Sequence, residues 1–171
     1  MTEGVRNVLF LCTGNSARII LAEALLNHWG KGQFRAYSAG SFPKGEVHPL
    51  AIETLQRMNL LVEGLRSKSW NEFAPSGAPH MDYILTVCDQ AAGEVCPIWP
   101  GHPVTAHWGL PDPAAATGSH AERLAVFEDA FQILQLRVQF FLTFRFKELK
   151  RADMQAKLGE AGKLLPTEPA P

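Results

Sequence analysis

The chain has 171 residues, of which 46% are hydrophobic, and its formal net charge is −1. This length and composition predict a single domain with a sizeable hydrophobic core, which we place at residues 1–150. The near-zero net charge gives no electrostatic basis for binding nucleic acid or an anionic membrane surface. No uncharged apolar stretch reaches the roughly 20 residues of a membrane span. The three cysteines are an odd number, which argues against a secreted disulfide framework, so we expect a cytoplasmic protein.

In the first half of the chain, the hydrophobic pattern predicts alternating strands and helices. Residues 8–11 form a short apolar run typical of a buried strand, and residues 17–26 show the spacing of a helix. A second strand is expected at residues 34–39 and a second helix at residues 48–58, with a proline near its start. Trp70 and Phe73 indicate a short helix or turn that packs on the body of the protein.

The second half continues the alternation and ends in a long helix. We expect strands at residues 83–87 and 104–108, and a helix over residues 119–150 that begins with a capping box of Ser119 and Glu122. Residues 151–171 lose this periodicity, so we expect a frayed tail. Alternating strands and helices indicate an α/β fold: a four-stranded parallel sheet flanked by helices, with a long C-terminal helix.

The long helix carries two apolar stripes. One stripe has the spacing of a face that packs on the core. The other comprises Ile133, Leu136, Phe140 and Phe144. Because one small sheet cannot easily cover both, we hypothesise a homodimer through this helix.

Residues 12–18 have the sequence Cys-Thr-Gly-Asn-Ser-Ala-Arg, between the first predicted strand and the first predicted helix. Backbone N–H groups and the helix dipole at such a turn favour a bound anion and lower the pKa of a thiol. Arg18 adds a planar fork of donors for two oxygens of a phosphate-like group. We therefore expect Cys12 to be a nucleophile. The residues expected to bind a tetrahedral oxyanion are Thr13, Gly14, Asn15, Ser16, Ala17 and Arg18.

Further reactive side chains follow the other predicted strands. Because parallel strands end at one edge of a sheet, Cys88 and Asp112 should lie on the same rim as Cys12. Thiol exchange between Cys88 and Cys96 requires Cα atoms within about 7 Å of each other. Asp112 precedes a proline, which suits either a turn or a general acid. A zinc site is the alternative for the cysteines, but no Cys-x-x-Cys or histidine pair supports it, and His107 is a weak candidate for a supporting role.

Together these segments resemble the thioredoxin-coupled arsenate reductases, which share the fold of the low-molecular-weight protein tyrosine phosphatases. The resemblance covers residues 5–150: the 12–18 loop, the Cys88 and Cys96 pair, and the acid loop at residues 107–114. It implies an arsenate reductase in which Cys12 attacks arsenate held by Arg18, with help from Asp112. A disulfide then passes from Cys12–Cys88 to Cys88–Cys96.

The resemblance also implies the partners. Arsenate is the expected substrate, with phosphate and sulfate as competitors. No cofactor is expected to be bound, and an external thiol reductant is expected to regenerate the enzyme: thioredoxin, glutaredoxin or a low-molecular-weight thiol. Asn15, Glu23 and Ser38 match residues that bind potassium in some relatives, although the remaining carboxylate of that site has no clear match.

Two alternatives remain open at this point. The first is a protein tyrosine phosphatase that uses Cys12, Arg18 and Asp112. It is disfavoured because Ala114, Ala115 and Ala116 stand where such enzymes carry aromatic walls for a phenyl ring. The second is a non-catalytic oxyanion-binding regulatory module. It draws some support from Ile19, which occupies a position where relatives often have a serine or threonine that hydrogen-bonds the thiolate.

Overall fold

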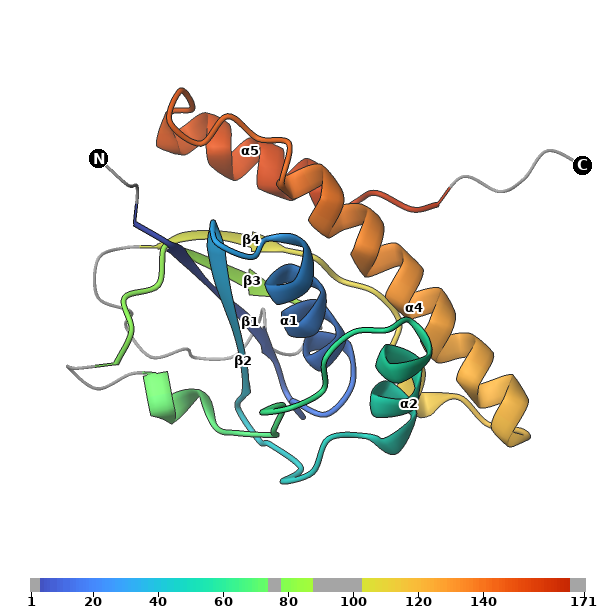
Figure 1. Cartoon of the computed structure of the whole chain (residues 1–171). Helices are drawn as coiled ribbons and strands as arrows, with labels where there is room; N and C mark the ends of the chain where they lie inside the picture. The colour runs from blue at the N-terminus through green and yellow to red at the C-terminus, as the bar shows by residue number, and fades with distance from the viewer. Residues whose placement is uncertain (1–3, 74–77, 88–102, 167–171) are drawn as a thin grey trace, which may run out of the picture.

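A computed structural model of the chain describes residues 4–73, 78–87 and 103–166. Its centre is a four-stranded sheet in the order β2-β1-β3-β4, and every pair of neighbours is parallel. The strands are β1 (Arg6–Cys12), β2 (Phe34–Gly40), β3 (Tyr83–Thr86) and β4 (Val104–His107). Figure 1 shows this sheet with the helices packed around it. The predicted α/β fold with a four-stranded parallel sheet is confirmed.

Helices and short helical turns connect and cover the strands. They are α1 (Arg18–Trp29), α2 (Pro49–Arg57), η1 (Trp70–Phe73), η2 (Pro113–Ala115), α4 (His120–Phe141) and α5 (Arg151–Ala161). The predicted capping box of Ser119 and Glu122 starts α4. Within the described residues, no helix is both long and apolar enough to cross a membrane.

The start of α2 depends on His48. Its Nδ1 accepts a hydrogen bond from the N–H of Leu50 at 3.1 Å, and Pro49 occupies the first helical position. Burial lowers the pKa of His48, as do the nearby cations Arg123 and Lys44. The neutral ring favoured by this shift is the form in which Nδ1 accepts a hydrogen bond.

The central strand β1 is buried on both faces. Val8 and Phe10 belong to a large apolar cluster that includes residues of α1, α2, α4 and α5. Leu9 and Leu11 point to a smaller cluster that includes Trp70 and Phe73 of η1. Successive side chains of a strand face opposite sides, so a strand covered on both sides has a continuous apolar sequence. This is why the β1 sequence shows no polar alternation.

The prediction of a single helix over residues 119–150 is wrong, because α4 ends at Phe141 and a turn follows. Two aromatic side chains of this turn account for the break. The rings of Phe144 and Phe146 lie 5.7 Å and 5.1 Å from the ring of Phe141, and Phe146 also contacts Phe34 at 5.0 Å. In a continuous helix, residues 144 and 146 would point about 160° apart. The turn lets both rings reach the same core.

The frayed tail predicted from residue 151 is also wrong over α5, which docks on the sheet beside β4 (Figure 1). Met154 and Leu158 of α5 are buried. The indole N–H of Trp108 donates a hydrogen bond to the carbonyl of Leu158 at 2.9 Å. Met154, Leu158 and Ala161 have helical spacing, so the sequence contained a sign of this helix. The last five residues, 167–171, lie outside the described part of the chain.

The second apolar stripe of the long helix is largely covered within the chain itself. Phe144 is 7% exposed, while Ile133 and Phe140 are partly buried against the core. Leu136 is half-buried. A second copy of the chain would therefore have less apolar surface to cover than the sequence pattern indicated. Dimerisation through the helix stays a prediction.

Replacing Leu158 by alanine tests whether α5 is part of the folded body. Because Leu158 is fully buried, Leu158→Ala should lower the free energy of unfolding by about 2–5 kcal/mol. The measurement is urea unfolding, with the exposed neighbour Gln155→Ala as the control. If both variants unfold at the same urea concentration, the helix does not contribute to stability.

Candidate active site

The loop at residues 13–17 joins the end of β1 to the start of α1, as the sequence predicts. It surrounds a cavity of about 220 Å³. The cavity is lined by Cys12, Thr13, Gly14, Asn15, Ser16, Ala17, Arg18, Ile19, Phe42, Lys44 and Asp112. The structure therefore brings the predicted nucleophile, the predicted anion-binding residues and the predicted acid to one site.

The loop is held from outside by the chain that leaves β2. The N–H groups of Ser41, Phe42, Lys44 and His48 donate to the carbonyls of Cys12, Thr13, Gly14 and Ser16, at 3.2, 3.0, 2.9 and 2.8 Å. In a trans peptide unit, the N–H points opposite to the carbonyl. The N–H groups that follow these four carbonyls therefore point away from the 41–48 segment. This arrangement turns backbone donors toward the space that an oxyanion would occupy.

Asn15 and Gly40 make the tight path of this loop possible. Asn15 has a positive φ of 45°, a conformation that asparagine tolerates better than most residues. Gly40, at the end of β2, lies directly beside the loop. A Cβ atom on Gly40 would collide with the carbonyl oxygen of Thr13 and would lie 3.1 Å from the nitrogen of Asn15. Only glycine allows β2 to end this close to the loop.

Arg18 places its guanidinium beside the sulfur of Cys12. Its Nη2 lies 3.4 Å from Cys12 Sγ, and its Nη1 donates to the carbonyl of Leu110 at 2.9 Å. Cys12 is 5% exposed and lies before the N-terminus of α1, whose N-cap residue, Ala17, makes no side-chain cap. Positive charge and unpaired helical N–H groups both favour the thiolate form of cysteine.

Asp112 has the turn role that the sequence suggested, and its carboxyl group also faces the site. Its Oδ1 accepts a hydrogen bond from the N–H of Ala114 at 3.0 Å and so caps η2. Its Oδ2 lies 3.9 Å from Nη2 of Arg18, and the carboxyl group lines the cavity. One oxygen thus holds the loop while the other is available to the site.

Arg137 supports the acid loop from α4. It is 2% exposed, and its Nη1 donates to the carbonyls of Trp108 and Gly109 at 2.9 and 3.1 Å. Burial lowers the pKa of Arg137. Arg137 was not predicted from the sequence to support the site. A charged side chain within an apolar helical stripe was the available sign.

Sequence reasoning also missed Phe42 and Lys44, which come from the chain after β2. Both line the cavity. The side chain of Lys44 covers Gly14, because a Cβ atom on this glycine would lie 3.3 Å from Lys44 Cε. Nothing in the local sequence marked these residues, since their place depends on the pairing of β1 with β2.

The three residues that resemble a potassium site do lie together beneath the loop. Asn15 Nδ2 donates to Ser38 Oγ at 3.0 Å, and Ser38 Oγ donates to Glu23 Oε2 at 3.3 Å. A fourth residue, Lys68, joins them with its Nζ 3.8 Å from Glu23 Oε1. Burial raises the pKa of Glu23 to about 6, against the opposing effect of Lys68. These residues do not fit a potassium ion, because an ammonium group already faces the carboxylate.

His107 does not line the loop cavity, although it lines a neighbouring cavity that Arg18 also borders. His107 pairs with Thr86 through its Nδ1, at 2.8 Å from the threonine Oγ1. Cys88 and Cys96 lie outside the described residues. The described chain reaches Val87, one residue before Cys88, where the Val87 N–H donates to the carbonyl of Leu11 at 2.9 Å.

Comparison with known proteins identifies the family. The chain belongs to the low molecular weight phosphotyrosine protein phosphatase family, whose pattern matches residues 7–155. It is 32% identical to an arsenate reductase of Shouchella clausii over 134 residues, which cover 78% of this chain and 93% of that protein. It is 35% identical to an arsenate reductase of Bacillus cereus strain ATCC 14579 over 126 residues, which cover 71% and 87% of the two chains.

Solved structures agree with this assignment. A thioredoxin-dependent arsenate reductase of Corynebacterium glutamicum matches with a TM-score of 0.54 and 26% identity, over 81% of this chain and 64% of that one. A low molecular weight protein tyrosine phosphatase of T. tengcongensis matches with a TM-score of 0.64 and 23% identity, over 78% and 95% of the two chains. The second match shows the shared fold.

Replacing Gly40 by alanine tests the support of the loop. The added Cβ would displace the Thr13 carbonyl, and strain of about 1–3 kcal/mol should weaken binding of inorganic phosphate roughly tenfold. The measurement is how strongly phosphate slows the alkylation of Cys12. It is made in a Cys88→Ser/Cys96→Ser background, where Cys12 is the sole thiol.

Gly159→Ala is the matched control, because a Cβ atom there has no neighbour within 4 Å. It should leave phosphate protection unchanged and stabilise helix α5 by up to about 1 kcal/mol. Equal protection in the Gly40 and Gly159 variants would contradict the proposed close approach.

Proposed function

We propose that this chain reduces arsenate to arsenite through a thiolate adduct on Cys12. The observation that carries the proposal is the position of Arg18 Nη2, 3.4 Å from Cys12 Sγ, inside a small cavity that also contains Asp112. The names of the curated relatives support the same substrate. A tetrahedral oxyanion held by Arg18 and the loop N–H groups would present its central atom to the sulfur.

In the first step, the Cys12 thiolate attacks arsenic and a bond to one arsenate oxygen breaks. That oxygen leaves as water once protonated, and we assign the protonation to Asp112 because this residue lines the cavity. Arg18 and the loop N–H groups neutralise the charge on the remaining oxygens. The adduct still contains arsenic(V), because no electrons have moved to arsenic at this stage.

In the second step, the thiolate of Cys88 attacks Cys12 Sγ, and the sulfur–arsenic bond breaks. The electron pair of that bond stays with arsenic, which leaves as arsenite, and a Cys12–Cys88 disulfide forms. The thiolate of Cys96 then attacks Cys88, so Cys12 is released and the disulfide becomes Cys88–Cys96. Support for Cys88 comes from the described chain, which places Val87 beside Leu11, one residue from Cys12.

The cycle closes when an external dithiol reduces the Cys88–Cys96 disulfide and supplies two electrons. We propose a thioredoxin-like protein for this role, because the relative from Corynebacterium glutamicum is described as thioredoxin-dependent. Glutaredoxin or a low-molecular-weight thiol would use the same exchange chemistry.

The relay predicts that both outer cysteines are essential for turnover. With arsenate, thioredoxin, thioredoxin reductase and NADPH, the wild type should consume NADPH. Cys88→Ser and Cys96→Ser should lose at least about a hundredfold in rate, because each interrupts electron transfer after the adduct forms. The readout is NADPH absorbance.

Hydrolysis of an aryl phosphate by the same variants is the internal control that shows whether the anion-binding loop around Cys12 is intact. It needs Cys12, Arg18 and Asp112 but neither outer cysteine. Hydrolysis without arsenate-dependent NADPH consumption in the wild type would favour a phosphatase. If the folded wild type has neither activity, the result would favour a non-catalytic oxyanion-binding module.

A second candidate function, aryl phosphate hydrolysis, is favoured by one observation. Phe42 is 75% exposed and lines the same cavity as Cys12. The three alanines after Pro113 supply no aromatic wall, but Phe42 offers one from another part of the chain. We propose that hydrolysis of aryl phosphates accompanies arsenate reduction at this site.

Replacing Phe42 by alanine separates the two activities. Phe42→Ala should raise the KM for an aryl phosphate roughly 2–10-fold, because ring contacts contribute about 0.5–1.5 kcal/mol. Arsenate has no ring, so its reduction should be unchanged, and Phe42→Tyr should behave as the wild type. Equal losses of both activities would show that the side chain shapes the loop itself.

A further inference from the structure

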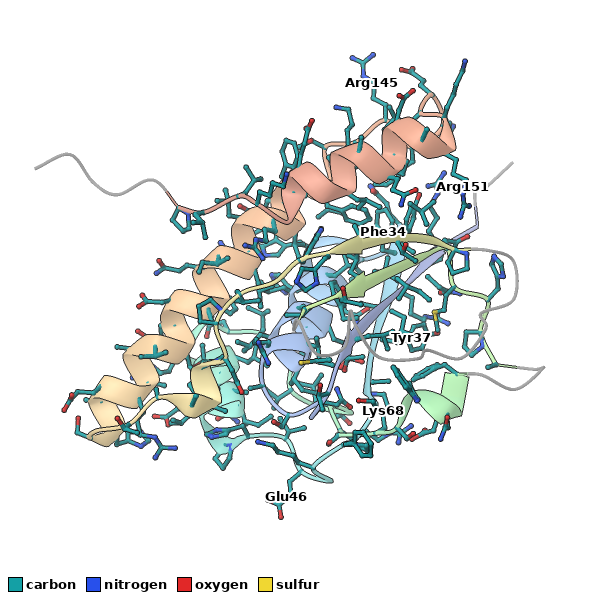
Figure 2. The ribbon with its side chains drawn as sticks, turned by 180° about the vertical axis from the view of Figure 1, so that it is seen from behind. Phe34, Tyr37, Glu46, Lys68, Arg145 and Arg151 are labelled. Carbon is teal, nitrogen blue, oxygen red and sulfur yellow. The ribbon has the colours of Figure 1, made fainter. Side chains whose placement is uncertain are left out.

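A buried ammonium group lies beneath the loop at residues 13–17, which we call the anion loop. The Lys68 side chain is 6% exposed, and its Nζ lies 3.8 Å from Oε1 of Glu23, whose side chain is 10% exposed. The same Nζ donates to the carbonyl of Arg66 at 3.1 Å. Figure 2 shows Lys68 beyond Tyr37, toward the end of the sheet where the loop lies, and far from Arg145. A buried lysine is rare unless it is paired.

Lys68 is connected to the loop through both its backbone and its side chain. Its backbone N–H donates to Oδ1 of Asn15 at 2.6 Å, and its carbonyl accepts from the N–H of Gly40 at 2.9 Å. Its ammonium group faces Glu23, which reaches Asn15 through Ser38. Asn15 is thereby held at both ends of its amide, in the left-handed conformation that the loop requires.

This arrangement leaves no favourable place for a second cation. A potassium ion bound by oxygens of Asn15, Ser38 and Glu23 would lie within a few ångströms of Lys68 Nζ. Two positive charges about 4 Å apart repel strongly where water is excluded.

The charges around the pair are consistent with one internal cation. Burial raises the pKa of Glu23 and lowers the pKa of Lys68, so each group is costly to bury charged by itself. Arg66 and Glu72 also act on the pair, but these two form an exposed ion pair with each other at 2.6 Å. Removing only one member of a buried pair leaves an uncompensated charge.

We infer that Lys68 is a positioning residue whose ammonium group supplies the monovalent cation beneath the anion loop, so that the loop is formed without potassium. The geometry that carries the inference is the closed set of contacts from Lys68 through Glu23 and Ser38 to Asn15. The relevance to arsenate chemistry rests on the proposed function. The loop geometry itself does not, so the test uses readouts that need no arsenate.

The experiment compares Lys68→Ser with the wild type in potassium, sodium and choline chloride at equal ionic strength. One readout is the melting temperature. The other is the pH midpoint of Cys12 alkylation, measured in the Cys88→Ser/Cys96→Ser background. Lys31→Ser, at an exposed lysine, is the matched control.

The wild type and Lys31→Ser should give the same values in all three salts. In choline chloride, Lys68→Ser should melt roughly 6–20 °C lower, because Glu23 loses its counter-charge. Its alkylation midpoint should rise by about one unit, because a loosened loop stabilises the thiolate less. Potassium should restore both values toward those of the wild type.

Two results would overturn the inference. One is a potassium-dependent rise in melting temperature in the wild type. The other is a folded Lys68→Ser variant that potassium does not restore. If Lys68→Ser fails to fold, Glu23→Gln/Lys68→Met removes both charges and should fold without any response to potassium. A potassium response in that double variant would place the cation elsewhere and would also contradict the inference.

Discussion

The four hydrogen bonds between the anion loop and the chain that leaves β2 are the interaction on which the site depends. Strands β1 and β2 are parallel and in register, with Cys12 opposite Gly40, so the two chains emerge from the sheet side by side. N–H groups of residues 41–48, which follow β2, donate to the loop carbonyls from one side of the loop. The next N–H group after each of these carbonyls therefore points to the opposite side. The orientation of the loop N–H groups toward the cavity is thus a consequence of strand pairing. For this orientation, the loop sequence needs only residues that tolerate the backbone conformation.

The acid loop is fixed by a separate set of contacts, which come from the C-terminal helices. Arg137 of α4 holds the carbonyls of Trp108 and Gly109, and α5 accepts the indole N–H of Trp108. The carbonyl of Leu110 in turn engages Arg18. Helices distant in sequence from the loop therefore set the place of Asp112 relative to Cys12, and the two halves of the site meet at the guanidinium group of Arg18.

The features that could be predicted from the sequence are those determined by local pattern. The apolar run before Cys12, the helix after it and the capping box at Ser119 are confirmed, because each depends on residues a few positions apart. Lys68, Phe42 and Arg137 could not be placed, because their roles arise from contacts across the sheet or between helices. The break after Phe141 was missed for the same reason: a preference of Phe144 and Phe146 for the core overrides their helical tendency. Cys88 and Cys96 remain sequence predictions.

The hydrogen bond from Arg18 to the Leu110 carbonyl fixes the guanidinium before any anion arrives. An arginine side chain has about 2 kcal/mol of rotamer entropy, and here much of it is lost during folding instead of during binding. A receptor that is already rigid gains affinity for every anion of matching shape and charge. Arsenate and phosphate share both properties, so such a cradle discriminates little between them at the binding stage. Selectivity would then lie in kinetics, in the ease with which the central atom accepts electrons from sulfur.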